Sequence, residues 1–321
     1  EVRRTICTHC SVGCAVDAVV ENGVWVRQEP VFDSPINLGA HCAKGAALRE
    51  HGIVQALAAT GRTVTWGDTV TAQPMLATSR LDAIEGFSER LAGTVAQVLR
   101  QNQQPLVLGG DHSCAVGTWS AVANHLRPQG ALGLVWIDAH LDAHTPDTSD
   151  SQAPHGMPVA ALLGHGSAGM TDLFGWRHKL QPQHLVIIGA RSYEPAEKAL
   201  LDSLGVRVMF MPEVLERGFA ACFDEARTRV QIGTAGWGIS FDLDGLDPRD
   251  APGTGTPVEQ GIRLADALQV LAGCSQDPQF VALELTEYNP LRDFGGQTAQ
   301  AATDLVCAML APERKALGLA A

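Results

Sequence analysis

Aromatic and basic residues are both scarce in this chain, and each shortage narrows what it can be. Phe, Trp and Tyr make up 5% of the 321 residues, and 23 Lys and Arg face 35 Asp and Glu, for a formal net charge of −12. A protein that binds nucleic acid through its phosphates needs the opposite balance, so we expect no nucleic-acid partner. No apolar run reaches the ~20 residues that a membrane-spanning helix needs, so we expect no membrane partner and a cytoplasmic location.

Cysteine is sparse as well, with eight residues in the chain. That number is too small for a disulfide scaffold of this length. Half of the cysteines crowd into the first 42 positions, which favours metal ligation over cross-linking. The hydrophobic share of 45% supports a sizeable core and excludes a disordered chain.

The chain changes character near residue 45. Two β-rich runs at 15–20 and 24–26 flank a Glu-Asn-Gly turn, which predicts a β-hairpin. Farther along, helical and strand patterns alternate, which predicts βαβ units and a mostly parallel sheet. We therefore expect a cysteine-rich segment at 1–45 and an α/β domain at 46–321. The expected helices include 46–58 and 80–101, and the expected strands are 62–66, 105–108, 132–137, 184–188, 207–210, 238–241 and 280–285.

Polar residues directly follow three of these strands. The segments are GGDHS (109–113), DAHLDAH (138–144) and DLDGLDP (242–248). Ligands bind at the carboxyl ends of strands in parallel α/β sheets. Because alternate residues of an extended segment share a face, we expect convergence within each segment. The converging residues are Asp138, His140 and Asp142 in one segment, and Asp242 and Asp244 in the other.

Together with His112, this edge would hold four carboxylates and two imidazoles. So many like charges repel and are forced to protonate unless cations are present. Two divalent metals resolve the conflict, and oxygen-rich ligation with one His per metal favours Mn²⁺. The alternative is that these residues are only helix caps and turns, which often follow strands.

Residues from about 45 to 321 resemble the arginase/agmatinase (ureohydrolase) family in GGDHS, DAHLD (138–142) and SFDLDGLDP (240–248). The resemblance implies a three-layer fold, in which a parallel sheet of about eight strands carries helices on both faces. It also implies two Mn²⁺ per chain, with Asp138 and Asp242 bridging them, and a homo-oligomer, trimer or hexamer. One ion would be held by His112, Asp138, Asp142 and Asp242, and the other by Asp138, His140, Asp242 and Asp244.

The resemblance further implies hydrolysis of a guanidino group to urea by a hydroxide that bridges the metals. Asp142 would take the proton of the nucleophile. His155, in His-Gly-Met-Pro, matches the family's proton-shuttle histidine and would serve the leaving amine. Glu287, in Thr-Glu-Tyr-Asn-Pro, matches the carboxylate that binds the guanidinium. As ordinary loop residues, His155 and Glu287 would instead be merely solvated or part of a turn.

The substrate depends on what meets the far end of the ligand. Glu194 aligns with the carboxylate that arginases use near the α-amino group, and Ser149 and Ser151 lie where arginases place hydroxyls for the α-carboxylate. His144 stands where many arginases have Asn, and an imidazole can still donate to that carboxylate. Thr256 matches a substrate-pocket threonine, with a plain turn residue as the alternative. We expect L-arginine as the substrate and urea and L-ornithine as products, with an agmatinase or another guanidino-compound ureohydrolase as the alternative.

The spacing Cys7-x2-Cys10-x3-Cys14-x27-Cys42 suits four thiolates around a 4Fe–4S cluster. This segment resembles the N-terminal iron–sulfur portion of the molybdopterin-dependent formate dehydrogenase catalytic subunit. A tetrahedral zinc site is the alternative. The rival to an active ureohydrolase is therefore a non-catalytic iron–sulfur electron-transfer or regulatory fusion.

The iron–sulfur-like segment stands where arginases have their first strand. Either the hairpin substitutes for that strand, or the sheet has an unpaired position at its edge. A genuine fusion, a gene-model artefact and an engineered chimera are all compatible with this sequence.

Overall fold

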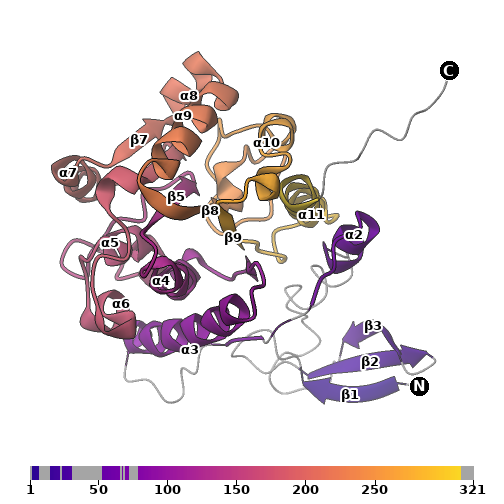
Figure 1. Ribbon diagram of the computed structural model, residues 1–321. Helices are drawn as coiled ribbons and strands as arrows, with labels where there is room; N and C mark the ends of the chain where they lie inside the picture. The colour runs from indigo at the N-terminus through magenta and orange to yellow at the C-terminus, as the bar shows by residue number, and fades with distance from the viewer. Residues whose placement is uncertain are drawn as a thin grey trace.

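The computed structural model describes residues 2–6, 15–21, 24–30, 53–65, 67, 69–71 and 79–311 (Figure 1). The candidate cluster ligands Cys7, Cys10, Cys14 and Cys42 lie outside these residues, as do residues 46–52 of the first expected helix. Within the described ranges, no helix combines the length and apolar character needed to cross a membrane.

Six parallel strands form the main sheet in the order β4-β9-β8-β5-β6-β7. All six were expected from the sequence, and their bounds agree to within a few residues. The strands are β4 (Leu106–Leu108), β5 (Ala131–Ile137), β6 (Leu185–Ala190), β7 (Arg207–Phe210), β8 (Thr234–Asp242) and β9 (Phe280–Thr286).

Side chains that alternate along each strand enter two separate hydrophobic cores. In β5, Leu134 and Trp136 belong to one core, whereas Val135 and Ile137 belong to the other. A parallel strand buried on both faces must be apolar at nearly every position, which is why these segments read as continuous apolar runs. We call the core that contains Trp136 the first core and the one that contains Ile137 the second core.

Helices cover both faces of the sheet, so the predicted three-layer α/β fold is confirmed (Figure 1). The first core is completed by α3 (Arg80–Arg100), α4 (Ala115–Leu126), α5 (Pro158–Leu162) and α7 (Pro195–Leu204). The second core is completed by α2 (Ile53–Ala59), α8 (Met211–Arg217), α9 (Phe219–Gln231), α10 (Leu264–Val270) and α11 (Gln297–Leu310). A short helix, α6 (Ala168–Thr171), packs in a small cluster beside α5.

The N-terminal hairpin is confirmed and gains a third strand. Strands β1 (Val2–Ile6), β2 (Ala15–Glu21) and β3 (Val24–Pro30) pair antiparallel in a sheet of their own. The hairpin does not pair with the six-stranded sheet. Of the two outcomes considered for the sheet edge, the described residues therefore fit the one in which the edge keeps an unpaired position.

The main sheet has six strands in the described residues, compared with the eight or so that were expected. Residues 62–65, which were expected to begin a strand, have no strand partner in the described part of the chain. They line the same cavity as β4, and no hydrogen bond joins them to it. Residues 62–65 therefore do not extend the six-stranded sheet, and in the described part of the chain its hydrogen-bonded ladder ends at β4.

Candidate active site

The sheet order explains how residues far apart in sequence meet. Strands β5 and β8 are neighbours, and Ile137 pairs in register with Phe241. The residues that follow them, Asp138 and Asp242, therefore leave the sheet side by side at its carboxyl edge. Strand β4 ends at the same edge, and its loop carries His112.

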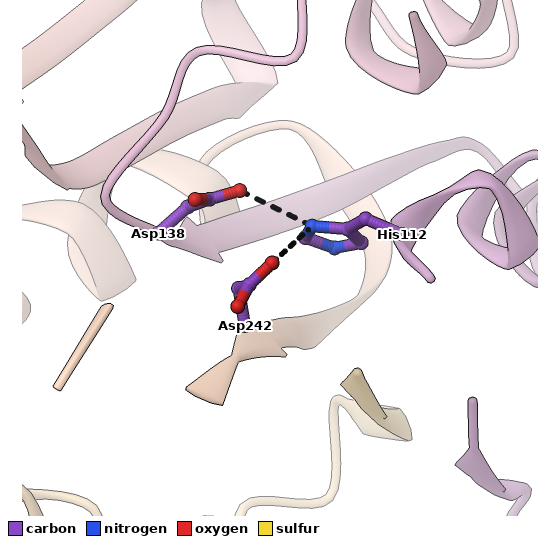
Figure 2. A group of neighbouring side chains, drawn as sticks. All are labelled: His112, Asp138 and Asp242. Carbon is purple, nitrogen blue, oxygen red and sulfur yellow. Dashed lines mark hydrogen bonds and ion pairs between the residues drawn. The ribbon is translucent and has the colours of Figure 1, made fainter. Parts of the chain in front are cut away.

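His112 lies at the centre of a first group of ligand atoms. Its Nδ1 is 3.1 Å from an Oδ2 atom of each of Asp138, Asp142 and Asp242. Figure 2 shows the carboxylates of Asp138 and Asp242 both pointing at this nitrogen. The structure thus brings together all four residues predicted for the first ion.

His140 lies in a second group beside the first. Its Nδ1 is 3.4 Å from Asp138 Oδ1 and 3.4 Å from Asp244 Oδ2. Asp138 thus faces His112 with one oxygen and His140 with the other. Asp242 directs its Oδ2 to His112, while its Oδ1 accepts a 2.8 Å hydrogen bond from the Asp244 amide. Within each group the donor atoms of three residues lie within 4.8 Å of one another.

The imidazoles are strongly perturbed by these carboxylates. Burial by itself lowers the pKa of both rings, but hydrogen bonds to the aspartates outweigh it. The pKa of His112 is raised well above its ordinary value, and that of His140 to about 12. Burial likewise opposes ionisation of Asp138, yet the two imidazoles hold its pKa well below the usual range.

The pKa values of Asp142 and Asp242 are shifted upward, in the opposite direction to that of Asp138. Burial and the charge of Asp138 raise the pKa of Asp142 to about 8. Burial, with the charges of Asp244 and Asp138, raises the pKa of Asp242 well above its usual value. The group therefore requires positive charge, which either protons or divalent cations can supply. Each ligand group combines carboxylate oxygens with one imidazole nitrogen, and this donor set fits Mn²⁺ or a similar hard cation.

Buried polar contacts behind the ligands fix their orientation. The Trp136 indole stacks on the His112 ring with centroids 4.0 Å apart, and its Nε1 donates to Asp138 Oδ2 at 2.8 Å. His112 Nε2 lies 2.9 Å from Ser240 Oγ, which in turn donates to Glu284 Oε2 at 2.7 Å. Such supporting contacts keep ligand side chains in the geometry that a cation needs.

A cavity of about 190 Å³ opens over both groups. It is smaller than the roughly 300–1,000 Å³ pockets that take drug-sized ligands, which suits a small substrate. All of the predicted substrate and catalytic residues line it, namely Asp142, His144, Ser149, Ser151, His155, Glu194, Thr256 and Glu287.

Glu287 is half-buried at one side of this cavity in a strained conformation. Its φ of 63° is in the left-handed region, as is the φ of 49° at Asp142. Glu287 Oε1 accepts a 2.8 Å hydrogen bond from the His112 amide, and its own amide donates to Gly110 at 2.8 Å. Burial and the charge of Asp111 raise the pKa of Glu287 to about 7. A cationic group bound here would lower that pKa again.

His144 is engaged with protein groups on both ring nitrogens. Nε2 contacts Glu194 Oε2 and lies 3.4 Å from Glu197 Oε2, while Nδ1 is 3.1 Å from Thr148 Oγ1. The ring is buried, whereas the Glu194 side chain is 64% exposed at the mouth of the cavity. The imidazole therefore orients the Glu194 carboxylate in this structure.

The other predicted pocket residues differ in their surroundings. His155 is exposed, in a short 3-10 helix, Pro154–Gly156, at the cavity rim. Ser149 Oγ is 3.4 Å from Ser151 Oγ. Thr256 Oγ1 donates to Asp244 Oδ2 at 3.0 Å, so this hydroxyl touches a candidate metal ligand.

Two residues at the site were not identified from the sequence. Glu197 is buried and accepts from the Ala143 amide at 3.1 Å and the Glu194 amide at 2.9 Å. The signal was a Glu-Pro-x-Glu pattern, in which a Glu at the third helical position caps the helix start. Arg191 donates to the backbone oxygens of Asp244, Gly245 and Leu246, and to that of Asp244 at 2.7 Å. Its signal was a cationic residue directly after a buried strand.

Comparison with known proteins agrees with this geometry. The arginase family model matches residues 35–311, and the molybdopterin oxidoreductase Fe4S4 domain model matches residues 1–52. Arginase of Bacillus caldovelox is 39% identical over 226 residues, which are 70% of this chain and 75% of that protein.

Solved structures give the same result. A crystal structure of arginase from Bacillus subtilis superposes with a TM-score of 0.79 at 34% identity, covering 84% of this chain and 92% of that one. A hypothetical agmatinase from Burkholderia thailandensis superposes with a TM-score of 0.57 at 26% identity, covering 70% and 63% of the two chains.

A parallel α/β fold with clustered Asp and His ligands at its carboxyl edge, together with these matches, defines a hydrolase of the amidinohydrolase type. The chain belongs to the arginase family.

Proposed function

We propose that this protein is a binuclear manganese hydrolase that cleaves L-arginine to urea and L-ornithine. The observation that carries the proposal is Asp138, which directs one oxygen to His112 and the other to His140. A carboxylate that faces two ligand groups in this way suits a bridge between two cations.

The two cations would share the aspartates of the β5 and β8 ends. One would be held by His112, Asp138, Asp142 and Asp242, and the other by Asp138, His140, Asp242 and Asp244. When bound, such ions lower the pKa of coordinated water toward neutrality and so supply a nucleophile. The protein's contribution is to place the guanidinium carbon beside it and to move the protons.

Glu287 would bind the guanidinium through charge-assisted hydrogen bonds. Its carboxylate is already held by the His112 amide, so the substrate cation would be aligned with the ligand group. Asp142, next to His112, would accept the proton of the attacking water. His155 at the rim would deliver a proton to the amine of ornithine as it leaves, which its exposure to solvent allows.

The α-amino end of arginine would meet Glu194, while Ser149 and Ser151 would donate to the α-carboxylate. We propose that His144 acts here as a positioning residue, because it contacts the carboxylates of Glu194 and Glu197. An agmatinase is the second candidate. Agmatine has no carboxylate, so these hydroxyls would then have nothing to bind.

We further propose that the chain divides near residue 45, within the overlap of the two family matches at 35–52. Residues 1–45 would bind a 4Fe–4S cluster through Cys7, Cys10, Cys14 and Cys42, and a zinc ion is the alternative ligand. Absorbance near 400 nm after anaerobic purification distinguishes the two, because zinc is colourless. A cytoplasmic homo-oligomer remains our expectation for the assembled enzyme.

The proposal is tested by metal analysis of the full chain after incubation with Mn²⁺ and gel filtration. We expect two manganese ions per chain and urea release from L-arginine that disappears on chelation and returns with Mn²⁺. A single bound ion in a fully active preparation would contradict the binuclear assignment.

A further inference from the structure

Arg191 directly follows β6 and is tied to the carboxyl edge of the sheet by its whole side chain. Its guanidinium donates six hydrogen bonds of 2.7–3.4 Å, and each of the six acceptors is a backbone carbonyl oxygen. The acceptors belong to Gly189, Asp244, Gly245, Leu246, Val258 and Glu259. A guanidinium carries five N–H donors in one plane, so these bonds engage every edge of it.

Half of the acceptors belong to the segment that follows β8. Nη2 donates to the carbonyl oxygens of Asp244 at 2.7 Å and Leu246 at 3.1 Å, and Nη1 donates to that of Gly245 at 3.4 Å. Asp244 is a proposed ligand of the second cation only. The Arg191 side chain therefore holds the stretch of backbone from which the Asp244 carboxylate projects.

The backbone of Arg191 holds the other half of the second ligand group. Its N–H donates to the carbonyl oxygen of Ala139 at 2.8 Å, and the N–H of Ser192 donates to the same oxygen at 3.0 Å. Ala139 stands between Asp138 and His140, the two ligands on the segment after β5. One residue thus connects this segment with the one that follows β8.

Gly261 leaves the space that the guanidinium fills. A Cβ atom at Gly261 would lie 2.6 Å from Arg191 Nη2 and 2.5 Å from the carbonyl oxygen of Leu246, closer than real Cβ atoms approach. The next residue, Ile262, forms a β-bridge with Leu246. The loop that contains Gly261 therefore closes over the segment after β8 with Arg191 held between the two.

The positive charge of Arg191 offers a competing explanation, which predicts the opposite effect on metal binding. Burial lowers the pKa of Arg191, and the charges of Asp244, Asp138 and Asp247 oppose that shift, so the guanidinium lies within electrostatic reach of the ligand groups. A fixed positive charge repels a dication, and its removal alone would tighten metal binding. Loss of the hydrogen bonds would instead weaken it.

We propose that Arg191 is a positioning residue for the second cation: it holds the segments after β5 and β8 together, and so sets the separation of His140 from Asp244. The first cation depends on it far less. His112 is a proposed ligand of the first cation only, and it lies in the loop after β4, which accepts none of the six hydrogen bonds. This inference rests on the proposed function, because it requires two cations per chain.

The test is calorimetry of Mn²⁺ binding to the full chain after chelation, with electron paramagnetic resonance at each ratio of metal to protein. Arg191→Lys keeps the charge and loses the planar fork, and Arg191→Met loses both. Residues that support metal ligands typically contribute about 10- to 100-fold to metal affinity. We expect both variants to bind the second Mn²⁺ about 10- to 100-fold more weakly and the first within about threefold. The spectrum should then show single ions at ratios where the unmodified chain shows the spin-coupled pair.

Arg249→Lys is the matched control for Arg191→Lys. Arg249 is on the same segment after β8, but its side chain is 70% exposed and pairs with the carboxylate of Asp247. We expect this variant to bind both ions within about twofold of the unmodified chain, because an exposed pair contributes little. If circular dichroism shows that Arg191→Met does not fold, Arg191→Lys decides alone.

Three results with the variants would overturn the proposal. Tighter binding of the second ion by Arg191→Met would show that the charge governs affinity. Unchanged affinity in Arg191→Lys would show that the planar fork is not needed. Equal weakening of both ions would show a general loss of structure at the sheet edge. A single Mn²⁺ in the unmodified chain would overturn the binuclear function itself, and this outcome is recognised without any variant.

Discussion

Replacing Glu287 with Gln should abolish most arginine hydrolysis while leaving the metals in place. Glu287 Oε1 accepts the hydrogen bond from the His112 amide. In Glu287→Gln the amide oxygen would keep that bond, so the NH₂ group would point toward the guanidinium. A donor would then face the donors of the substrate, where the carboxylate would have accepted from them.

The size of the effect follows from the bonds that are lost. Two hydrogen bonds between the guanidinium and a carboxylate are worth about 1.5–3 kcal/mol each, so about 3–6 kcal/mol of transition-state stabilisation disappears. Since about 1.4 kcal/mol is a factor of ten, kcat/KM should fall on the order of 10²- to 10⁴-fold. Glu287 is not a proposed metal ligand, so manganese content should not change.

The assay is the initial rate of urea release from L-arginine at saturating Mn²⁺, with metal content measured on the same sample. Glu216→Gln, on the exposed side of α8, provides the matched control and should behave as the unmodified protein. A loss of less than tenfold in Glu287→Gln with both metals bound would refute the assigned contact with the guanidinium.

Three more predictions concern the metals and the protons. Asp138→Ala should remove most bound manganese and nearly all turnover, since both ligand groups lose an oxygen; two ions per chain in this variant, by mass spectrometry, would contradict the bridge. His155→Asn should keep the metals and lower kcat far more than it raises KM, because proton transfer is a transition-state interaction, and an unchanged kcat in steady-state assays would make it a simple loop residue. Burial and neighbouring charges raise the pKa of Asp142 to about 8 and that of Asp242 well above its usual value, so protons compete with cations below these values. Manganese affinity should therefore rise from pH 6 to 8 with proton release, as calorimetry in two buffers of different ionisation enthalpy can measure; a pH-independent affinity would contradict this.

The strands and the ligand segments were predictable because their signals are local. A run such as Leu-Val-Trp-Ile (134–137) is apolar at every position only when both faces are buried. Asp138 follows directly, and its place at the carboxyl edge depends only on that strand being parallel to its neighbours. The same reasoning placed His112 and Asp242 correctly, without knowledge of the strand order.

Which strands pair and which protein groups contact the side chains of the site were not predictable, because both depend on residues distant in sequence. Residues 62–65 have a strand-like pattern, but a strand also needs a neighbour, and the described chain supplies none. The imidazole of His144 was expected to meet the substrate, yet its partners, Glu194 and Glu197, come from the start of α7. Five of the six carbonyls that accept from Arg191 belong to residues 244–246 and 258–259, which are distant in sequence and leave no mark on the residues beside it.

The most direct test of the proposed function is kcat/KM of the manganese-loaded protein for L-arginine and for agmatine. The two share the guanidinium and differ at the α-carboxylate, for which Ser149 and Ser151 are the proposed donors. Ser149 is buried, and a buried donor left without a partner costs about 1–3 kcal/mol, so L-arginine should be preferred on the order of ten- to a hundredfold. Equal or faster turnover of agmatine would contradict the assignment of L-arginine as the substrate.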